Sequence, residues 1–217
     1  MNTNEKLNSI INKLVSSSDP DEVKSLYRQW SETYDHDLEQ FGYVAPTIAC
    51  EIFANRISTS SEPILDAGCG TGLVGVLLTQ LGYTNLHGSD FSPDMLTKAK
   101  TTGCYSKLNL TDFTLPFSES DNVYEAIISV GVYSKRFNEY FIDEVCRILK
   151  PGGSFLFTCR EQYYEEVAEK IKQLHSTNLI RYSEFQLDHY MKAQGAMAYY
   201  VLIQKSYSGM SENTDPR

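Results

Sequence analysis

Short apolar runs alternate with helical stretches along the chain from residue 63, and this alternation restricts the possible folds more than any other feature. The helical stretches are recognised by apolar side chains that recur every three or four residues. Strands and helices that alternate in this way form a parallel sheet covered by helices on both faces. The pattern predicts strands at residues 63–67, 85–89, 105–110, 124–130 and 154–158.

The helices and the end of the predicted domain have recognisable boundaries. Ser92 is suited to cap a helix that has Pro93 at its first position. The run Lys150-Pro151-Gly152-Gly153 is expected to stop a helix and turn into the last parallel strand. Two late β-rich runs, at residues 179–187 and 196–204, predict a hairpin. The other helices are expected at residues 73–81, 137–149 and 161–174.

The first 58 residues lack this alternation and are expected to be helical. Apolar residues recur at helical spacing over residues 7–14, a second helix is expected to begin at Asp19, and a third covers residues 44–57. We therefore predict one domain with three parts: a helical cap at residues 1–58, a Rossmann-like core at 59–206 and a flexible tail at 207–217.

Composition excludes several classes of protein. A content of 41% apolar and 22% charged residues is typical of a globular chain, and the net charge of -9 disfavours nucleic-acid binding, because like charges repel. Five cysteines without Cys-x-x-Cys spacing and four scattered histidines predict neither a disulfide framework nor a metal site. No apolar run approaches the about 20 residues that a membrane span needs. We expect a cytoplasmic protein without a membrane segment; the oligomeric state stays open.

A glycine-rich segment, Asp66-Ala67-Gly68-Cys69-Gly70-Thr71-Gly72, connects the first predicted strand to its helix. Ligands of parallel sheets bind at the carboxyl ends of the strands, and glycines allow the backbone to approach them closely. Two ligands use this arrangement. A dinucleotide places its pyrophosphate on the N-terminus of the helix. S-adenosylmethionine has no phosphate, but it carries an ammonium, a carboxylate and a positively charged sulfur.

Asp66 favours the second ligand, although the glycine spacing also satisfies the dinucleotide fingerprint. Gly70, Gly72 and Gly75 match that fingerprint, and Asp90 lies at the expected distance after them. The carboxylate of Asp66, however, would repel a pyrophosphate, whereas it would bind an ammonium by charge-assisted hydrogen bonds. Asp90 ends the second strand, where it is suited to accept hydrogen bonds from ribose hydroxyls; its alternative role is to cap the following helix.

Two motifs resemble those of the class I S-adenosylmethionine-dependent methyltransferases. The run from Ile64 to Gly72 looks like the first motif of that family, and residues 149–153 look like the turn before its fifth strand. A narrower resemblance, to the methyltransferase-like protein 27 group, rests on Trp30-x-x-x-Tyr34-Asp35, Gly42-Tyr43-x-Ala45-Pro46 and residues 86–92. The resemblance implies a seven-stranded Rossmann-like sheet of order 3-2-1-4-5-7-6, with strand 7 antiparallel, helices on both faces and an N-terminal helical cap.

The resemblance also implies which residues hold the cofactor. At the methionine end these are Asp66, for the ammonium, and the loop residues Ala67, Gly68, Cys69, Gly70, Gly72 and Leu73. At the adenosine end they are Asp90 on the ribose, Phe91, Met95 and Phe113 against the adenine, and Asp112 at its amino group. Val130 and Gly131 would pass beneath the sulfonium, and Trp30 and Tyr34 would close over the cofactor from the cap.

Three of these residues have structural alternatives. Trp30 is the only tryptophan, and burial in the interface of the cap would account for it equally well. Phe113 has the alternative of a core residue, and Asp112 that of a residue that caps a turn. At these three positions the sequence therefore does not distinguish a residue that contacts the cofactor from one that only supports the fold.

The implied activity is methyl transfer from S-adenosylmethionine to a small-molecule acceptor, with S-adenosylhomocysteine as the product and no metal. The cofactor supplies the reactivity, so the protein mainly has to orient the acceptor and exclude water. Many relatives carry a histidine after strand four; here Tyr133 begins that loop, and no catalytic base is identified. Tyr133 and Arg160 are the candidates for contact with the acceptor. Arg160 would bind a carboxylate of the acceptor; its alternative role is to form an exposed ion pair within the protein. A non-catalytic cofactor-binding module and a dinucleotide-dependent oxidoreductase remain as alternative functions.

Overall fold

The computed structural model of the chain describes residues 10, 13, 17, 19–133 and 138–207. The helix expected at residues 7–14 falls mostly outside this part of the chain. The tail predicted at residues 207–217 also lies outside it, apart from Tyr207. The structural statements that follow concern the described residues.

Seven strands form one sheet in the order β3-β2-β1-β4-β5-β7-β6, as the sequence motifs imply. Neighbouring strands from β3 to β5 are parallel, and β7 is antiparallel to both β5 and β6. The strand bounds are β1 Ile64–Ala67, β2 Leu86–Asp90, β3 Lys107–Leu110, β4 Tyr124–Ser129, β5 Leu149–Arg160, β6 Ile180–Met191 and β7 Ala196–Lys205. The predicted fold class is confirmed.

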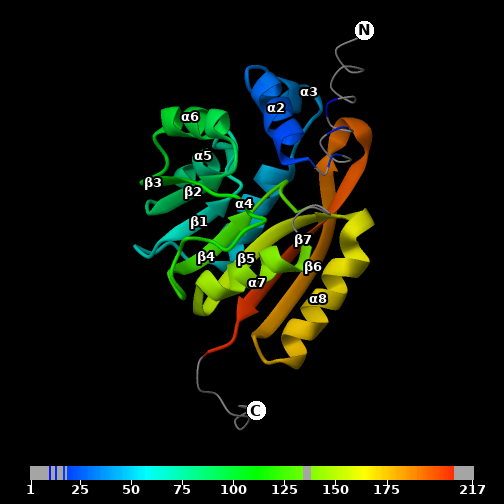
Figure 1. Cartoon of the computed structure of the whole chain (residues 1–217). Helices are drawn as coiled ribbons and strands as arrows, with labels where there is room; N and C mark the ends of the chain where they lie inside the picture. Colours follow the sequence, from blue (N-terminus) through cyan, green and yellow to red (C-terminus); the bar gives the residue numbers. More distant parts are fainter. Residues whose placement is uncertain (1–9, 11–12, 14–16, 18, 134–137, 208–217) are drawn as a thin grey trace.

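Helices cover both faces of this sheet, and the cap lies at one end of it (Figure 1). The side chain of Ser92 accepts a hydrogen bond from the backbone N–H of Met95, so the predicted cap of α6 is present. Among the described residues, no helix combines the length and the apolar character that crossing a membrane requires. The helix bounds are α2 Pro20–Ser31, α3 Tyr34–Gln40, α4 Ala45–Arg56, α5 Leu73–Gln80, α6 Pro93–Thr102, α7 Asn138–Ile148 and α8 Tyr164–Ser176, with short 3₁₀ turns at Glu161–Tyr163 and Lys192–Gln194.

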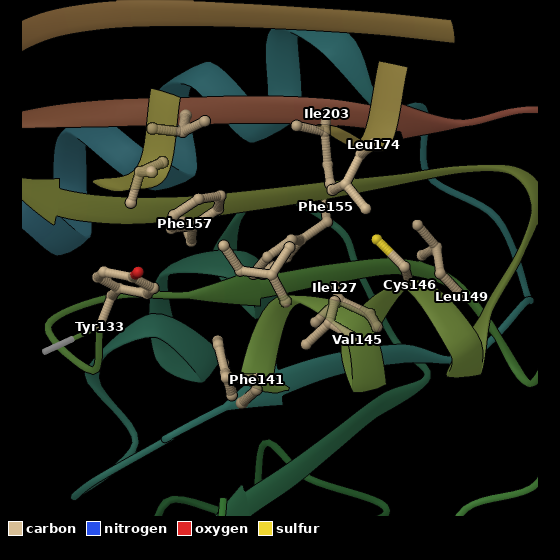
Figure 2. Packing of buried hydrophobic residues seen from close by; sticks show 14 of the residues in the cluster. Ile127, Tyr133, Phe141, Val145, Cys146, Leu149, Phe155, Phe157, Leu174 and Ile203 are labelled. Atoms are coloured by element: carbon tan, nitrogen blue, oxygen red, sulfur yellow. The ribbon is translucent and has the colours of Figure 1, made fainter. Parts of the chain in front are cut away.

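Two apolar layers hold the helices to the sheet. On one face, residues of α7 and α8 pack against β4, β5 and β7, with Phe141, Phe155 and Phe157 fully buried (Figure 2). On the other face, Phe53 of α4 and Leu78 of α5 pack against the sheet. Full burial of each such side chain contributes about 1.5–3 kcal/mol. These layers fix the strand ends and therefore the loops that follow them.

Three local expectations differ in detail from the structure. Residues 150–153 were expected to form a turn; they fall within the bounds of β5 but have no partner in β4, whose pairing passes from Leu149 directly to Ser154, and Gly152 has a positive φ of 79°. Tyr105 was expected in the third strand, but it precedes β3, and its hydroxyl accepts a hydrogen bond from the backbone N–H of Gly75 in α5. The helix α3 was not predicted. It is only seven residues long and buries a single apolar side chain, Leu38, so it leaves no helical pattern in the sequence.

Candidate functional site

A cavity of about 210 Å³ lies at the carboxyl ends of the parallel strands. A cavity at the carboxyl ends of the strands of a parallel sheet is the usual position of a small-molecule site. Loops after β1, β2 and β4, the end of β5, the cap and the β6–β7 hairpin form its wall. The wall consists of Val23, Tyr27, Trp30, Tyr34, Leu38, Tyr43, Gly68, Gly70, Asp90, Phe91, Met95, Phe113, Val130, Gly131, Val132, Tyr133, Thr158, Arg160, Tyr190, Met191, Gln194 and Ala196.

The glycine loop brings its backbone directly to this cavity. Gly68 and Gly70 have positive φ angles of 83° and 53°, which glycine adopts without strain. A Cβ atom on Gly68 would lie 2.0 Å from Cγ2 of Val132, so no side chain fits there. A Cβ atom on Gly70 would meet nothing within 4 Å. The loop therefore leaves open space in front of Gly70, where a ligand can approach the backbone.

Asp90 projects from the end of β2 into the wall of the same cavity. One carboxylate oxygen accepts a hydrogen bond from the backbone N–H of Gly70 and the other from that of Ser92, each at 2.9 Å. Burial raises the pKa of Asp90 to about 6, although these two N–H groups oppose the rise. Each carboxylate oxygen can accept more than one hydrogen bond. Asp90 is thus fixed in place and still able to bind ligand hydroxyls.

Asp66, in contrast, lies behind the loop and not in the wall of the cavity. Its carboxylate accepts a hydrogen bond of 2.6 Å from the hydroxyl of Tyr105, which in turn accepts one from the backbone N–H of Gly75. The second carboxylate oxygen of Asp66 is buried and has no hydrogen-bond partner among the described residues. Burial raises the pKa of Asp66 to about 7. Asp66 was expected to bind the ammonium of the ligand directly, but its carboxylate does not reach the cavity wall in this arrangement.

Protein side chains already lie at the N-terminus of α5, and one of them accepts a hydrogen bond from a backbone N–H of its first turn. The hydroxyl of Tyr105 occupies the N–H of Gly75, and Thr71 in the glycine loop donates a hydrogen bond of 2.6 Å to Asp35 of the cap. A pyrophosphate placed here would meet the carboxylates of Asp35 and Asp66. This geometry disfavours the dinucleotide, for the electrostatic reason that the sequence had indicated.

Aromatic side chains of the cap cover the cavity. The ring centroids of Trp30 and Tyr34 lie 4.5 Å apart with the rings edge to face, and the indole N–H of Trp30 donates to Asp37 at 2.9 Å. Tyr27 meets Phe91 edge-on with a centroid distance of 5.4 Å. Trp30 is both buried and part of the cavity wall, so burial in the cap and contact with a ligand are compatible roles for it.

The remaining predicted residues divide between the wall and its support. Phe91, Met95, Phe113, Val130 and Gly131 line the cavity, and Phe113 also packs against Phe117 and Phe141 in the core. Among the others, Asp112 accepts hydrogen bonds from Thr114, Ala67 is buried in β1, and Gly72 precedes α5; none of these three lines the main cavity. Cys69 and Leu73 line a smaller recess, whose wall shares Gly68, Gly70 and Val130 with the main cavity.

Both predicted acceptor residues line the cavity. The hydroxyl of Tyr133 donates to Glu166 at 3.0 Å, and the guanidinium of Arg160 lies 5.8 Å from the ring centroid of Tyr163. The wall also contains residues that were not predicted, among them Tyr43, Thr158 and Tyr190. Tyr43 belongs to one of the motifs quoted for the resemblance, which was a usable signal; the other two enter the site only because β5 and β6 are long enough to reach it.

Potential metal ligands do not gather in the described part of the chain, where no group of three or more histidine, cysteine, aspartate or glutamate side chains is suited to hold an ion. Among the described residues, the polar side chains of the cavity wall carry the hydroxyls of the tyrosines and of Thr158, the carboxylate of Asp90, the guanidinium of Arg160, the carboxamide of Gln194 and the indole N–H of Trp30.

Comparison with known proteins identifies relatives. A family model described as a methyltransferase domain matches residues 64–153. Human methyltransferase-like protein 27 is 31% identical over 170 residues, which cover 74% of this chain and 69% of that protein. Malonyl-[acyl-carrier protein] O-methyltransferase of Buchnera aphidicola is 37% identical over 120 residues, 53% of this chain but only 47% of that protein.

A solved structure from Methanococcus maripaludis, assigned as an S-adenosylmethionine-dependent methyltransferase, superposes with a TM-score of 0.63. It covers 90% of this chain and 97% of its own, and at 18% identity it supports the fold alone. The identity with the human relative over most of both chains, the matched domain and the strand order agree with one another. The chain therefore belongs to the class I S-adenosylmethionine-dependent methyltransferases.

Proposed function

We propose that the chain binds S-adenosylmethionine in the cavity at the strand ends and transfers its methyl group to a small-molecule acceptor. The observation that carries this proposal is Asp90, a carboxylate fixed by two backbone N–H groups at the wall of a cavity that the glycine loop leaves open. A pair of ribose hydroxyls is a suitable partner for such a carboxylate.

The described residues fit the cofactor at both of its ends. The open space in front of Gly70 accommodates the amino-acid part, and Asp66 contributes negative charge from behind the loop rather than by direct contact. We assign the adenine to Phe91, Met95 and Phe113, with Asp112 next to Phe113 in the sequence. The supporting loop residues, including Ala67, Cys69, Gly72 and Leu73, keep the bend in shape.

The cofactor, when bound, supplies a methyl group activated by a positively charged sulfur. The protein orients the acceptor against this methyl group and excludes water. Trp30 and Tyr34 of the cap and Tyr190 of the hairpin cover the cavity, which suits the second of these tasks. We propose that Val130 and Gly131 lie beneath the reacting atoms and that Tyr133 and Arg160 contact the acceptor.

We propose a small acceptor because the cavity lies under the cap and the hairpin, and because most of its wall is aromatic or aliphatic. The name of the Buchnera relative specifies an acceptor borne on a carrier protein. An acceptor of that kind would have to reach the cavity through an extended arm, so a free small molecule remains our choice.

Transfer of tritiated methyl groups tests this proposal. The protein is incubated with tritium-labelled S-adenosylmethionine and a cell extract, and the products are separated by size. We expect label in the small-molecule fraction, and we expect Asp90→Asn to abolish it. Label in protein or nucleic acid would contradict the small acceptor. Cofactor binding without any labelled product would favour the non-catalytic module.

A further inference from the structure

One side of the cavity, away from Asp90, carries a positive charge. Arg160 ends β5, where it pairs with Ala198 of β7, and its half-buried side chain lies in the cavity wall. It is the only cationic side chain in that wall among the described residues, and it forms no ion pair with any of them. The Cζ atom of its guanidinium lies 5.8 Å from the ring centroid of Tyr163, within the range of a cation–π contact.

Two tyrosine hydroxyls of the same wall converge on the loop after β4. A Cβ atom on Gly131 would lie 2.7 Å from the hydroxyl of Tyr43 and 3.1 Å from that of Tyr190. The two rings meet edge to face, with centroids 5.1 Å apart. Both hydroxyls therefore face the backbone of the loop after β4, which is where we place the reacting atoms.

These tyrosines act as hydrogen-bond donors and not as bases. Burial raises the pKa of Tyr43 well above its usual value, and it raises the pKa of Tyr190 although a hydrogen bond shared with Tyr43 and the charge of Arg160 oppose the rise. A phenol that keeps its proton can donate to an anionic oxygen but does not remove a proton from an acceptor. Asp90, the carboxylate of the wall, is engaged by Gly70 and Ser92 at the cofactor end.

We propose that the acceptor is a carboxylate and that the product is its methyl ester. The proposal rests on the function proposed above. Arg160 provides the charge that binds a carboxylate, and its guanidinium fork matches the planar geometry of that group. The hydrogen-bonded pair of Tyr43 and Tyr190 keeps one hydroxyl proton that can be donated to it. An acceptor that arrives already ionised needs no base.

The step balances without a proton. A lone pair of the carboxylate oxygen forms the new C–O bond to the methyl carbon, and the C–S bond breaks with its electron pair going to sulfur. The negative charge of the acceptor and the positive charge of the sulfonium disappear together, which leaves a neutral ester and neutral sulfur in S-adenosylhomocysteine. Loss of both charges is favoured in a site that excludes water.

Methyl esters are recognised by their lability in alkali. The protein is incubated with tritium-labelled S-adenosylmethionine and a small-molecule extract, the products are treated with mild alkali, and volatile tritiated methanol is measured. We expect most of the label to be released. Label that resists alkali, as in a methylated amine or ether, would overturn the carboxylate while leaving the methyltransferase function intact. Absence of any labelled product would count against the proposed function itself.

Substitution of Arg160 locates the effect in the site. We expect Arg160→Gln to lower ester formation at limiting acceptor at least tenfold, Arg160→Lys to recover part of it, and the dissociation constant of S-adenosylhomocysteine to stay within about twofold. Arg181→Gln is the matched control, because Arg181 is an exposed arginine of β6 outside the cavity wall. Ester formation by Arg160→Gln at the rate of the unmodified protein would overturn the proposal.

Discussion

The hydroxyl of Thr71 donates a hydrogen bond of 2.6 Å to the carboxylate of Asp35, which joins the glycine loop to the helical cap. Thr71 is buried and lies between Gly70 and Gly72, whereas Asp35 follows Tyr34 at the start of α3. The bond therefore holds the cap residue Tyr34 over the cavity. It also places a negative charge at the N-terminus of α5, where it is favourable for the helix dipole.

Replacing Thr71 by Val is expected to loosen this connection. Valine keeps the shape of the side chain but removes the donor, so the cap should close less firmly over the cofactor. We predict that calorimetry will show about fivefold weaker binding of S-adenosylhomocysteine, equivalent to about 1 kcal/mol. Thr97→Val is the control, because the hydroxyl of Thr97 bonds only within α6. Equal affinities in the two variants would show that the bond has no role in binding.

Asp90→Asn is expected to have the largest effect of any single substitution at the cofactor end. It removes the charge that strengthens hydrogen bonds from ribose hydroxyls, and we predict a loss of affinity for S-adenosylhomocysteine of about 30- to 100-fold, or about 2–3 kcal/mol. Asp94→Asn, in the first turn of α6 and outside the cavity wall, removes only a partly exposed ion pair with Arg28 and should bind as the unmodified protein does. Wild-type affinity in Asp90→Asn would remove Asp90 from the site.

The affinity should also depend on pH through the same residue. The pKa of Asp90 in the free protein is about 6, and bound hydroxyls would lower it because they stabilise the ionised form. The complex therefore holds fewer protons than the free protein, and acid weakens binding. We predict an affinity about tenfold lower at pH 5 than at pH 7. In Asp90→Asn this step should be absent; its persistence would assign the step to another group.

The buried charge of Asp66 should reduce stability at alkaline pH. Its folded pKa of about 7 lies above the value of an unfolded aspartate, so the folded protein holds more protons and loses stability as pH rises from 5 to 8. Relative to Asp66→Asn, the unmodified protein should lose about 2–3 kcal/mol of unfolding free energy over this range. Urea denaturation at both pH values measures the difference. A constant difference would mean that Asp66 does not titrate there.

Much of the fold was predictable because the local signals agree with the tertiary structure. The order of the sheet came from two motifs, at residues 64–72 and 149–153, and the cap of α6 came from Ser92 and Pro93. The start of β5 was not predictable, because Leu149, before the expected turn, already pairs with Tyr124 of β4, a contact between distant parts of the chain. Residues 150–153 themselves have no partner in β4, in agreement with the local preference of Pro and Gly.

The site was only partly predictable, because side-chain direction depends on packing. Asp66 is of the right residue type and stands at the right place in the sequence to bind an ammonium. Its carboxylate, however, already accepts a hydrogen bond from the hydroxyl of Tyr105, which comes from a different loop. Tyr190 lies in a strand whose role in the site depends on its length and on its pairing with β7. Contacts between different segments of the chain, such as that between Asp66 and Tyr105, leave no local signal in the sequence.

Calorimetric titration of the purified protein with S-adenosylhomocysteine and with NADH, side by side, tests the central claim most directly. We predict binding of S-adenosylhomocysteine with a dissociation constant on the order of micromolar, about -8 kcal/mol, and no measurable heat with NADH. Binding of NADH together with no heat from S-adenosylhomocysteine would contradict the assignment of this cavity.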